Sequence, residues 1–408
     1  MKKILPAVLA VLLTGCGIQQ ELPSAPETTA ATESTAPETT TETTAQTTHK
    51  TTAATTKQTT VTTAVTTAET TTETTAQTIP ETEPPETELP ETEAPEIPEE
   101  PAPEPEYGRV SMYSGVMVRD SGTPEARALE LFSGGFKNGQ RFAQALNDYK
   151  AALGEAVNVW CMVIPTSAAY YTPEELAGEY GSQLDNYNNI AEHLDGVNPV
   201  PVYDAIGAHT AEPLYSRTDY HWQPLAAYYA AEQFALTAQV PYAALDTYEA
   251  VTREGYVGAF YAVNRISELQ NAPESFTYYK PADLDSLTCT YYNTAFANPK
   301  EGRLFYEDNS IGASYTVFVG RDDCILQVDT GVENDRVLVI FKDSYGNALV
   351  PFLTQSFSTI YLCDFRYFDL NAQAFLRQVG ATDLLFAMST VAATTSGKIG
   401  QVEYHLVK

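Results

Sequence analysis

Aromatic residues are absent from a long part of this sequence. Residues 17–106 contain no Phe, Trp or Tyr and consist almost entirely of Thr, Ala, Pro, Glu and Ser. A segment of this composition cannot bury enough apolar surface to offset the chain entropy that folding would cost. Repeats of Pro and Glu between residues 80 and 106 favour extended polyproline II, at ~3.1 Å per residue. We therefore expect a disordered stalk over residues 17–106, with many hydroxyls open to glycosylation.

Positive charge is also scarce. The chain has 23 Lys and Arg against 53 Asp and Glu, a net charge of −30. The stalk contributes 2 − 18 = −16, and residues 107–408 contribute 19 − 35 = −16. A phosphate backbone would be repelled by either part. The sequence therefore excludes nucleic acid as a partner.

Cysteine and histidine are few, with five of each. No Cys-x-x-Cys motif and no histidine pair near a cysteine occurs, so we expect no metal site, no disulfide scaffold and no cofactor. Three cysteines lie in apolar runs that favour buried, reduced thiols, namely Cys161, Cys324 and Cys363.

The N-terminus has the features of an export signal. Lys2 and Lys3 precede an apolar run over residues 4–13, which is too short to span a bilayer. Small residues then lead to Cys16, as in the lipobox of bacterial lipoproteins. The simpler alternative is an ordinary signal peptide that happens to contain a cysteine. We expect residues 1–16 to direct lipidation of Cys16, which would hold the protein on the membrane surface outside the cytoplasm.

Residues 107–408 contain all the aromatic residues and alternate helix and strand signals. This alternation predicts an α/β fold with a mostly parallel sheet flanked by helices. A β-rich insertion is expected over about residues 245–330, with a separate lobe as the alternative. Helices are expected at 136–153, 184–194, 224–238, 345–355 and 370–379, and strands at 157–164, 199–203, 337–341, 359–363 and 384–387.

A serine follows one of these strands directly. In an open α/β sheet, reactive groups belong at the carboxyl ends of strands. Ser344 comes just after the strand ending at Phe341, where the N-terminus of the next helix offers free N–H groups to an oxyanion. The alternative interpretation is that Asp343 or Ser344 only caps that helix.

A histidine with a nearby carboxylate lies more than a hundred residues earlier. In an extended segment, Asp219 and His221 project to the same side, so the carboxylate can bond one ring nitrogen. The other nitrogen is then free to accept a serine proton. The remaining histidines lie in the stalk, near the chain end, or in a helix and a loop expected at the surface.

Two sequence blocks resemble a known family. RTDYHWQPLAAYYA and KDSYGNALVPFLTQSFSTIYLCDFRYF resemble the two characteristic blocks of the DHHW family, which is similar to the SGNH-hydrolase-like domains of alginate O-acetyltransferases. The resemblance implies Ser344 as nucleophile, His221 as base and Asp219 as orienting acid. Tyr220 stands where the family usually has His, and Lys342 where the wider superfamily tends to have Gly.

The resemblance leaves the oxyanion hole open, because the separate Gly and Asn blocks of SGNH hydrolases cannot be located here. The backbone N–H of Ser344 and the side chain of Asn347 are our candidates, with Tyr345 as a further oxyanion or substrate contact. Arg366 is a candidate anchor for an acidic sugar, although pairing with Asp364 is the alternative. Trp222 is a candidate ligand platform or, alternatively, a core residue.

The sequence therefore supports two functions. The first is a surface-anchored serine O-acetyltransferase or esterase that acts on a glycan or polysaccharide of the cell envelope, with a possible partner protein as acyl donor. The second is a non-catalytic surface protein that uses the same scaffold to bind glycans or assembly partners.

Overall fold

The computed structural model describes residues 108–408. The predicted stalk and the predicted anchor at Cys16 lie outside the described residues. Within residues 108–408, no helix is both long enough and apolar enough to cross a membrane.

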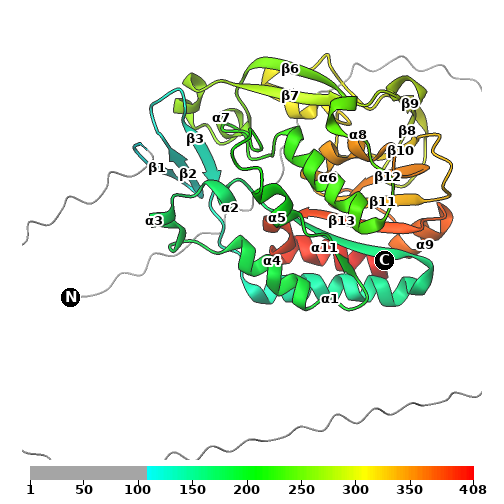
Figure 1. Ribbon diagram of the computed structural model, residues 1–408. Helices are drawn as coiled ribbons and strands as arrows, with labels where there is room; N and C mark the ends of the chain where they lie inside the picture. Colours follow the sequence, from blue (N-terminus) through cyan, green and yellow to red (C-terminus); the bar gives the residue numbers. More distant parts are fainter. Residues whose placement is uncertain (1–107) are drawn as a thin grey trace, which may run out of the picture. The chain divides into compact units, whose positions relative to one another are not determined.

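An eight-stranded mixed sheet forms the centre of this part of the chain (Figure 1). Five neighbouring strands are parallel and three at one edge are antiparallel. The predicted α/β fold is therefore confirmed. In spatial order the strands are β5 (Asn198–Pro199), β4 (Asn158–Ile164), β13 (Asp383–Ser389), β11 (Val337–Lys342), β12 (Thr359–Asp364), β10 (Ile325–Asp329), β8 (Thr288–Tyr292) and β9 (Lys300–Gly302).

The parallel strands are continuous apolar runs because helices cover both faces of the sheet. Successive residues of β4 alternate between two hydrophobic clusters, with Val159 in one and Trp160 in the other. One face is covered by α1 (Phe136–Leu153), α4 (Gln183–Glu192), α9 (Ala372–Gln378) and α11 (Ser396–Val407), and the other by α5 (Val202–Gly207), α6 (Pro224–Ala238) and α8 (Val350–Leu353).

The two long helices follow their sequence signals. In α1, Phe142, Leu146 and Tyr149 recur at helical spacing and are fully buried. Helix α6 begins with Pro224 and ends at Gln239, which adopts the left-handed conformation common at helix ends. Both helices cover the predicted ranges, 136–153 and 224–238.

Two predicted elements differ from the structure. The expected strand at 199–203 is only the two residues of β5, because Pro199 and Pro201 cannot donate ladder hydrogen bonds. The expected helix at 345–355 is instead the 3₁₀ segment η6 (Ser344–Leu349) followed by the single turn α8. Helix α11 and a small sheet of β1 (Ser111–Tyr113), β2 (Val116–Arg119) and β3 (Arg127–Glu130) had no sequence prediction.

The region expected as a β-rich insertion contributes to the central sheet. Strands β8, β9 and β10 extend the sheet beyond β12, while β6 (Glu249–Tyr256) and β7 (Glu274–Lys280) pair with each other. Cys324, expected to be buried, lies just before β10 and is partly exposed, whereas Cys289 is buried in β8. The short helices are α2 (Ala168–Tyr171), α3 (Glu174–Ala177), α7 (Ala259–Ala262) and α10 (Thr390–Ala393).

Candidate active site

Ser344 follows the carboxyl end of β11 and is the first residue of η6. Asp343 provides the helix cap, because its Oδ1 accepts the backbone N–H of Tyr345 at 3.1 Å. Its Oδ2 accepts the backbone N–H and the hydroxyl of Ser389, at 3.0 and 2.7 Å, which ties the turn to β13. The hydroxyl of Ser344 is therefore not used for capping, and Ser344 is partly exposed between two buried neighbours.

The structure brings Asp219, His221 and Ser344 together. Nε2 of His221 lies 2.8 Å from Oγ of Ser344, and Nδ1 lies 2.8 Å from Oδ1 of Asp219. An ionised carboxylate only accepts hydrogen bonds, so Nδ1 carries the ring proton and Nε2 accepts from the serine hydroxyl. The segment is not extended as predicted. It forms a bend, because Oδ1 of Asp219 also accepts the backbone N–H of His221 at 2.9 Å.

The second carboxylate oxygen of Asp219 is also satisfied. It accepts the hydroxyl of Tyr256 at 2.7 Å and the backbone N–H of Ala259 at 2.8 Å. Burial alone would raise the pKa of Asp219, but the attraction of the carboxylate to His221 when that ring is protonated, and the hydrogen bonds from His221 and Ala259, outweigh burial. The pKa is therefore held below its ordinary value. Asp219 is therefore an ionised, buried carboxylate bonded to the ring of His221.

Aromatic rings fix the imidazole of His221 in place. The ring of Tyr315 stacks on it, with centroids 3.8 Å apart and planes inclined by 5°. The Tyr315 hydroxyl donates to the backbone oxygen of Ser344 at 3.0 Å, so one side chain contacts both partners of the Ser–His pair. Trp222 supports this arrangement by donating its indole N–H to the Tyr315 hydroxyl at 3.1 Å.

Trp222 and Tyr345 face the protein interior rather than a ligand. Trp222 is fully buried, so the structure places it in the core, the alternative to a ligand platform. Tyr345 is also buried, and its hydroxyl donates to the backbone oxygen of Tyr220. Both side chains therefore hold the His221 segment against the Ser344 turn.

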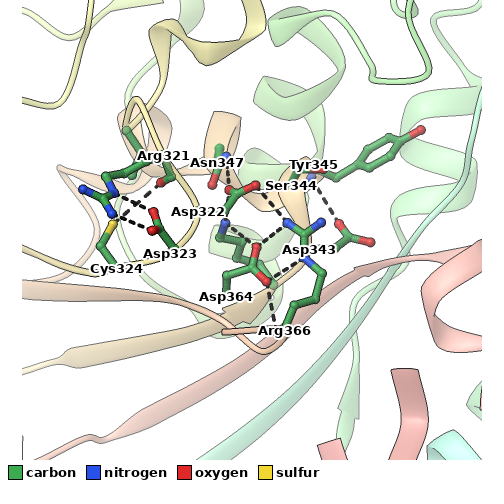
Figure 2. Close-up of polar contacts among 12 residues, drawn as sticks. Arg321, Asp322, Asp323, Cys324, Asp343, Ser344, Tyr345, Asn347, Asp364 and Arg366 are labelled. Atoms are coloured by element: carbon green, nitrogen blue, oxygen red, sulfur yellow. Dashed lines mark hydrogen bonds and ion pairs between the residues drawn. The ribbon is translucent and has the colours of Figure 1, made fainter. Parts of the chain in front are cut away.

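A network of charges lies beside the Ser344 turn (Figure 2), with Lys342 and Asp364 buried and Asp322 and Arg366 partly exposed. The Lys342 ammonium donates to Asp322 at 2.7 Å and to Asp364 at 2.8 Å. The Arg366 guanidinium makes paired contacts with Asp364, at 2.7 and 2.6 Å, and one with Asp322 at 2.9 Å. Burial alone would lower the pKa of Lys342, but the two carboxylates raise it. Arg366 is thus paired with Asp364, the alternative to an anchor for an acidic sugar.

Asn347 belongs to the same network. Its side-chain N–H donates to Asp322 at 2.9 Å, and the residue is buried. Its amide therefore points into the charged network (Figure 2). The backbone N–H groups of the first helical turn have no acceptor within the helix. The backbone N–H of Ser344 is therefore better placed than the Asn347 side chain to donate to an oxyanion.

Several supporting residues were not found from the sequence. Glu274 on β7 accepts the backbone N–H groups of Arg217 and Thr218 and the Thr218 hydroxyl, at 2.8 to 2.9 Å. Together with Tyr256, Ala259, Tyr315 and Asp322, it comes from the region predicted to be an insertion. That region holds the residues before His221 in place. No sequence signal distinguished its tyrosines from packed or interfacial ones.

Glu130, at the end of β3, lies close enough to the site to interact electrostatically with His221 and Asp343. Burial and the negative charge of Asp343 raise its pKa, while His221 opposes the shift. No sequence signal distinguished this residue from other surface glutamates.

These features define a class of protein. An α/β sheet whose carboxyl edge carries a Ser–His–Asp chain of hydrogen bonds on a strand-to-helix turn occurs in several families of α/β proteins. The model of the DHHW protein family matches residues 136–363. A DHHW family protein from Eubacterium siraeum has 41% identity and a TM-score of 0.68, covering 72% of this chain and 97% of that one. The chain belongs to the DHHW family, and the resemblance seen in its sequence is confirmed.

Two more distant structures were also compared. Bacillus cereus PatB1, solved with a sulfonyl adduct, has 17% identity and a TM-score of 0.57, over 71% of this chain and 98% of PatB1. The O-acetyltransferase domain of Pseudomonas putida AlgJ has 12% identity and a TM-score of 0.39, over 74% of this chain and 99% of that domain. No curated protein matched the sequence.

Proposed function

We propose that this protein is a serine O-acetyltransferase or esterase that acts on a glycan of the cell envelope. The observation that carries the proposal is the continuous chain from Asp219 through His221 to Ser344, with both hydrogen bonds at 2.8 Å. A non-catalytic glycan-binding protein would have no need to keep a partly exposed serine at hydrogen-bond distance from an oriented imidazole.

The proposed reaction has two half-reactions. His221 takes the proton of Ser344 through Nε2 as Oγ attacks the carbonyl carbon of an acetyl ester. The resulting oxyanion accepts the backbone N–H of Ser344. When the intermediate collapses, the alcohol leaves with the proton from His221, and acetyl-Ser344 remains.

The second half-reaction reverses these roles. A sugar hydroxyl or a water molecule gives its proton to His221 and attacks acetyl-Ser344. Collapse returns the proton to Ser344 and releases an acetylated sugar or acetate. The acceptor that enters the site distinguishes a transferase from an esterase, and exclusion of water favours the transferase.

The N-terminal sequence supports a location outside the cytoplasm. In this proposal Cys16 is lipidated, the stalk over residues 17–106 spans the envelope, and a partner protein can deliver the acyl group. Cys16→Ser should release the protein into the medium or leave it unprocessed. Normal processing with retention in the membrane fraction would contradict the anchor.

The catalytic proposal is tested with Ser344→Ala. We expect the wild-type protein to release acetate from p-nitrophenyl acetate or from acetylated glycans, and the variant to be slower by at least about 10³-fold. Ser286→Ala, which removes a surface hydroxyl from the segment η4 (Leu284–Ser286), is the matched control and should keep full activity. A wild-type protein that releases no acetate, with Ser344→Ala binding glycan unchanged, would favour the non-catalytic function.

A further inference from the structure

A cavity of about 160 Å³ lies outside the Ser–His–Asp arrangement. Its walls come from the residues that follow β3, from α2 and α3, from the start of α4 and from α5. The residues of 108–408 that line it include no Asp, Glu, Lys, Arg or His. The occupant that this wall favours is therefore uncharged.

The cavity and the site lie at the same, carboxyl edge of the sheet. Helix α2 begins just after β4, and β4, β13 and β11 are adjacent parallel strands. Neighbouring strands are ~4.8 Å apart, so the ends of β4 and β11 are separated by about 10 Å. A line of rings connects the two places. The ring centroid of Tyr203, in the cavity wall, lies 5.2 Å from that of Tyr170. The centroid of Tyr170 lies 5.9 Å from that of Tyr215. Tyr215 forms a β-bridge with Trp222, next to His221.

The chemistry of the wall suits a sugar ring. Tyr180 and Tyr203 are partly exposed and provide ring surface for the C–H face of a pyranose, while the ring of Phe132 is buried in the wall. The Thr172 hydroxyl donates to the backbone oxygen of Ala168 at 2.7 Å, so its oxygen remains free as an acceptor. Ser182 accepts from the N–H of Asp185 at 3.0 Å, so its O–H remains free to donate. One donor and one acceptor beside two partly exposed rings match a neutral, hydroxylated ring.

Size limits the ligand to one ring. Pockets for drug-sized ligands begin at ~300 Å³, about twice the volume of this cavity. The aromatic wall is also fixed before a ligand binds. The backbone oxygen of Phe132 accepts the N–H of Gly181 at 2.9 Å. A Cβ on Gly134 would lie 2.5 Å from the Phe132 ring, and one on Gly181 would lie 3.2 Å from it. Glycine at both positions therefore lets the backbone approach the ring closely.

We propose that this cavity binds one uncharged pyranose ring of the glycan substrate and so positions a neighbouring sugar unit at Ser344. The inference rests on the proposed function for its place in the reaction. Sugar binding itself can be measured without turnover.

The binding test uses the full-length protein, and saturation-transfer NMR detects binding. The four probes are the methyl glycosides of glucose, galactose, mannose and N-acetylglucosamine. At least one should bind saturably to the wild type and at least tenfold more weakly to Ala177→Trp, which places a large ring in the cavity. Ala250→Trp, at an exposed position on β6, is the control and should bind normally. Tyr180→Ala provides a second variant, with the same loss expected, in case the tryptophan disturbs folding.

Activity provides an independent test. Ala177→Trp should hydrolyse p-nitrophenyl acetate like the wild type, because this small ester does not occupy the cavity. Its KM for acetylated glycan should rise at least tenfold. The proposal is overturned if none of the four glycosides binds the wild type, or if Ala177→Trp binds them unchanged. A changed preference between acetate and butyrate esters would also overturn it, since the cavity would then hold an acyl chain. If Ala177→Trp loses glycoside binding while Ser344→Ala keeps full esterase activity, the proposed function is refuted. The cavity would still be a sugar-binding site.

Discussion

The carboxylate of Asp219 accepts four hydrogen bonds, from the ring and backbone of His221, from Tyr256 and from Ala259. This number of donors explains how a charge can stay ionised in a buried position. It also fixes the tautomer of the imidazole, since the nitrogen that faces the carboxylate must carry the proton. The other ring nitrogen, Nε2, therefore faces the hydroxyl of Ser344.

Asp219→Asn tests this role at the level of one residue. The amide keeps the shape but no longer selects the tautomer, so we expect kcat for p-nitrophenyl acetate to fall by about 10³ to 10⁴. Tyr256→Phe removes one of the four donors and leaves the charge, so its loss should be much smaller. An Asp219→Asn variant within tenfold of the wild type would show that the carboxylate does not orient the histidine.

Glu130→Gln tests the effect of a carboxylate near the site on stability. The pKa of Glu130 is raised in the folded protein, so the unfolded chain gives up this proton more readily. The glutamate therefore becomes less favourable for folding as pH rises from its ordinary pKa through the raised one. Compared with the wild type, the Glu130→Gln variant should have a higher melting temperature at pH 8 and nearly the same melting temperature at pH 4. The opposite order would mean that Glu130 is stabilised as a carboxylate.

The sequence pointed to the three residues that the structure brings together, Asp219, His221 and Ser344, but not to the residues that surround them. Asp219 and His221 are two positions apart, and Ser344 follows a clear buried strand, so each signal is local. Tyr256 is 37 residues from its partner Asp219, and Tyr315 is 29 residues from Ser344. Contacts of this kind depend on tertiary packing, and a buried tyrosine looks the same in sequence whether it orients a charge or fills space.

The segment that connects β6 to α7 contacts Asp219 and the residue before it. Gly258 donates its N–H to the Thr218 hydroxyl at 2.9 Å, and Ala259 donates to Asp219. A Cβ on Gly258 would lie 2.4 Å from the Cβ of Asp219. Only glycine lets the backbone approach this closely.

Gly258→Ala should therefore displace Asp219. We expect activity to fall more than tenfold and stability to fall by about 1 to 3 kcal/mol in urea denaturation, as for other overpacked sites. Gly312→Ala is the control, because its nearest neighbour would be 3.7 Å away. Equal activity in the two variants would indicate that the connection does not determine the position of Asp219.

The strongest sequence patterns gave the most reliable elements. The helices at 136–153 and 224–238 have clear 3.6-residue periodicity, and both are found there. The segment after Ser344 has helical composition, but it begins as a 3₁₀ helix, in which the Gly346 N–H bonds the backbone oxygen of Asp343 three residues earlier. The region at 245–330 has strand signals, which do not specify the sheet that the strands join.

On the scale of the whole molecule, residues 108–408 have large hydrophobic clusters on both faces of the sheet, as expected of a part that folds alone. Deleting residues 20–100 should change the melting temperature by less than about 2 °C, which is under 1 kcal/mol for a domain of this size. Calorimetry of both forms is the measurement. A fall of many degrees would mean that the stalk contributes to the stability of the fold.

Chemical trapping of the nucleophile tests the central claim most directly. The full-length protein is treated with phenylmethylsulfonyl fluoride, digested and analysed by mass spectrometry. The account predicts one major adduct, on Ser344, that is lost in Ser344→Ala and forms at least about 100-fold more slowly in His221→Ala, because the histidine activates the serine. An unmodified Ser344, or equal labelling in the wild type and His221→Ala, would contradict it.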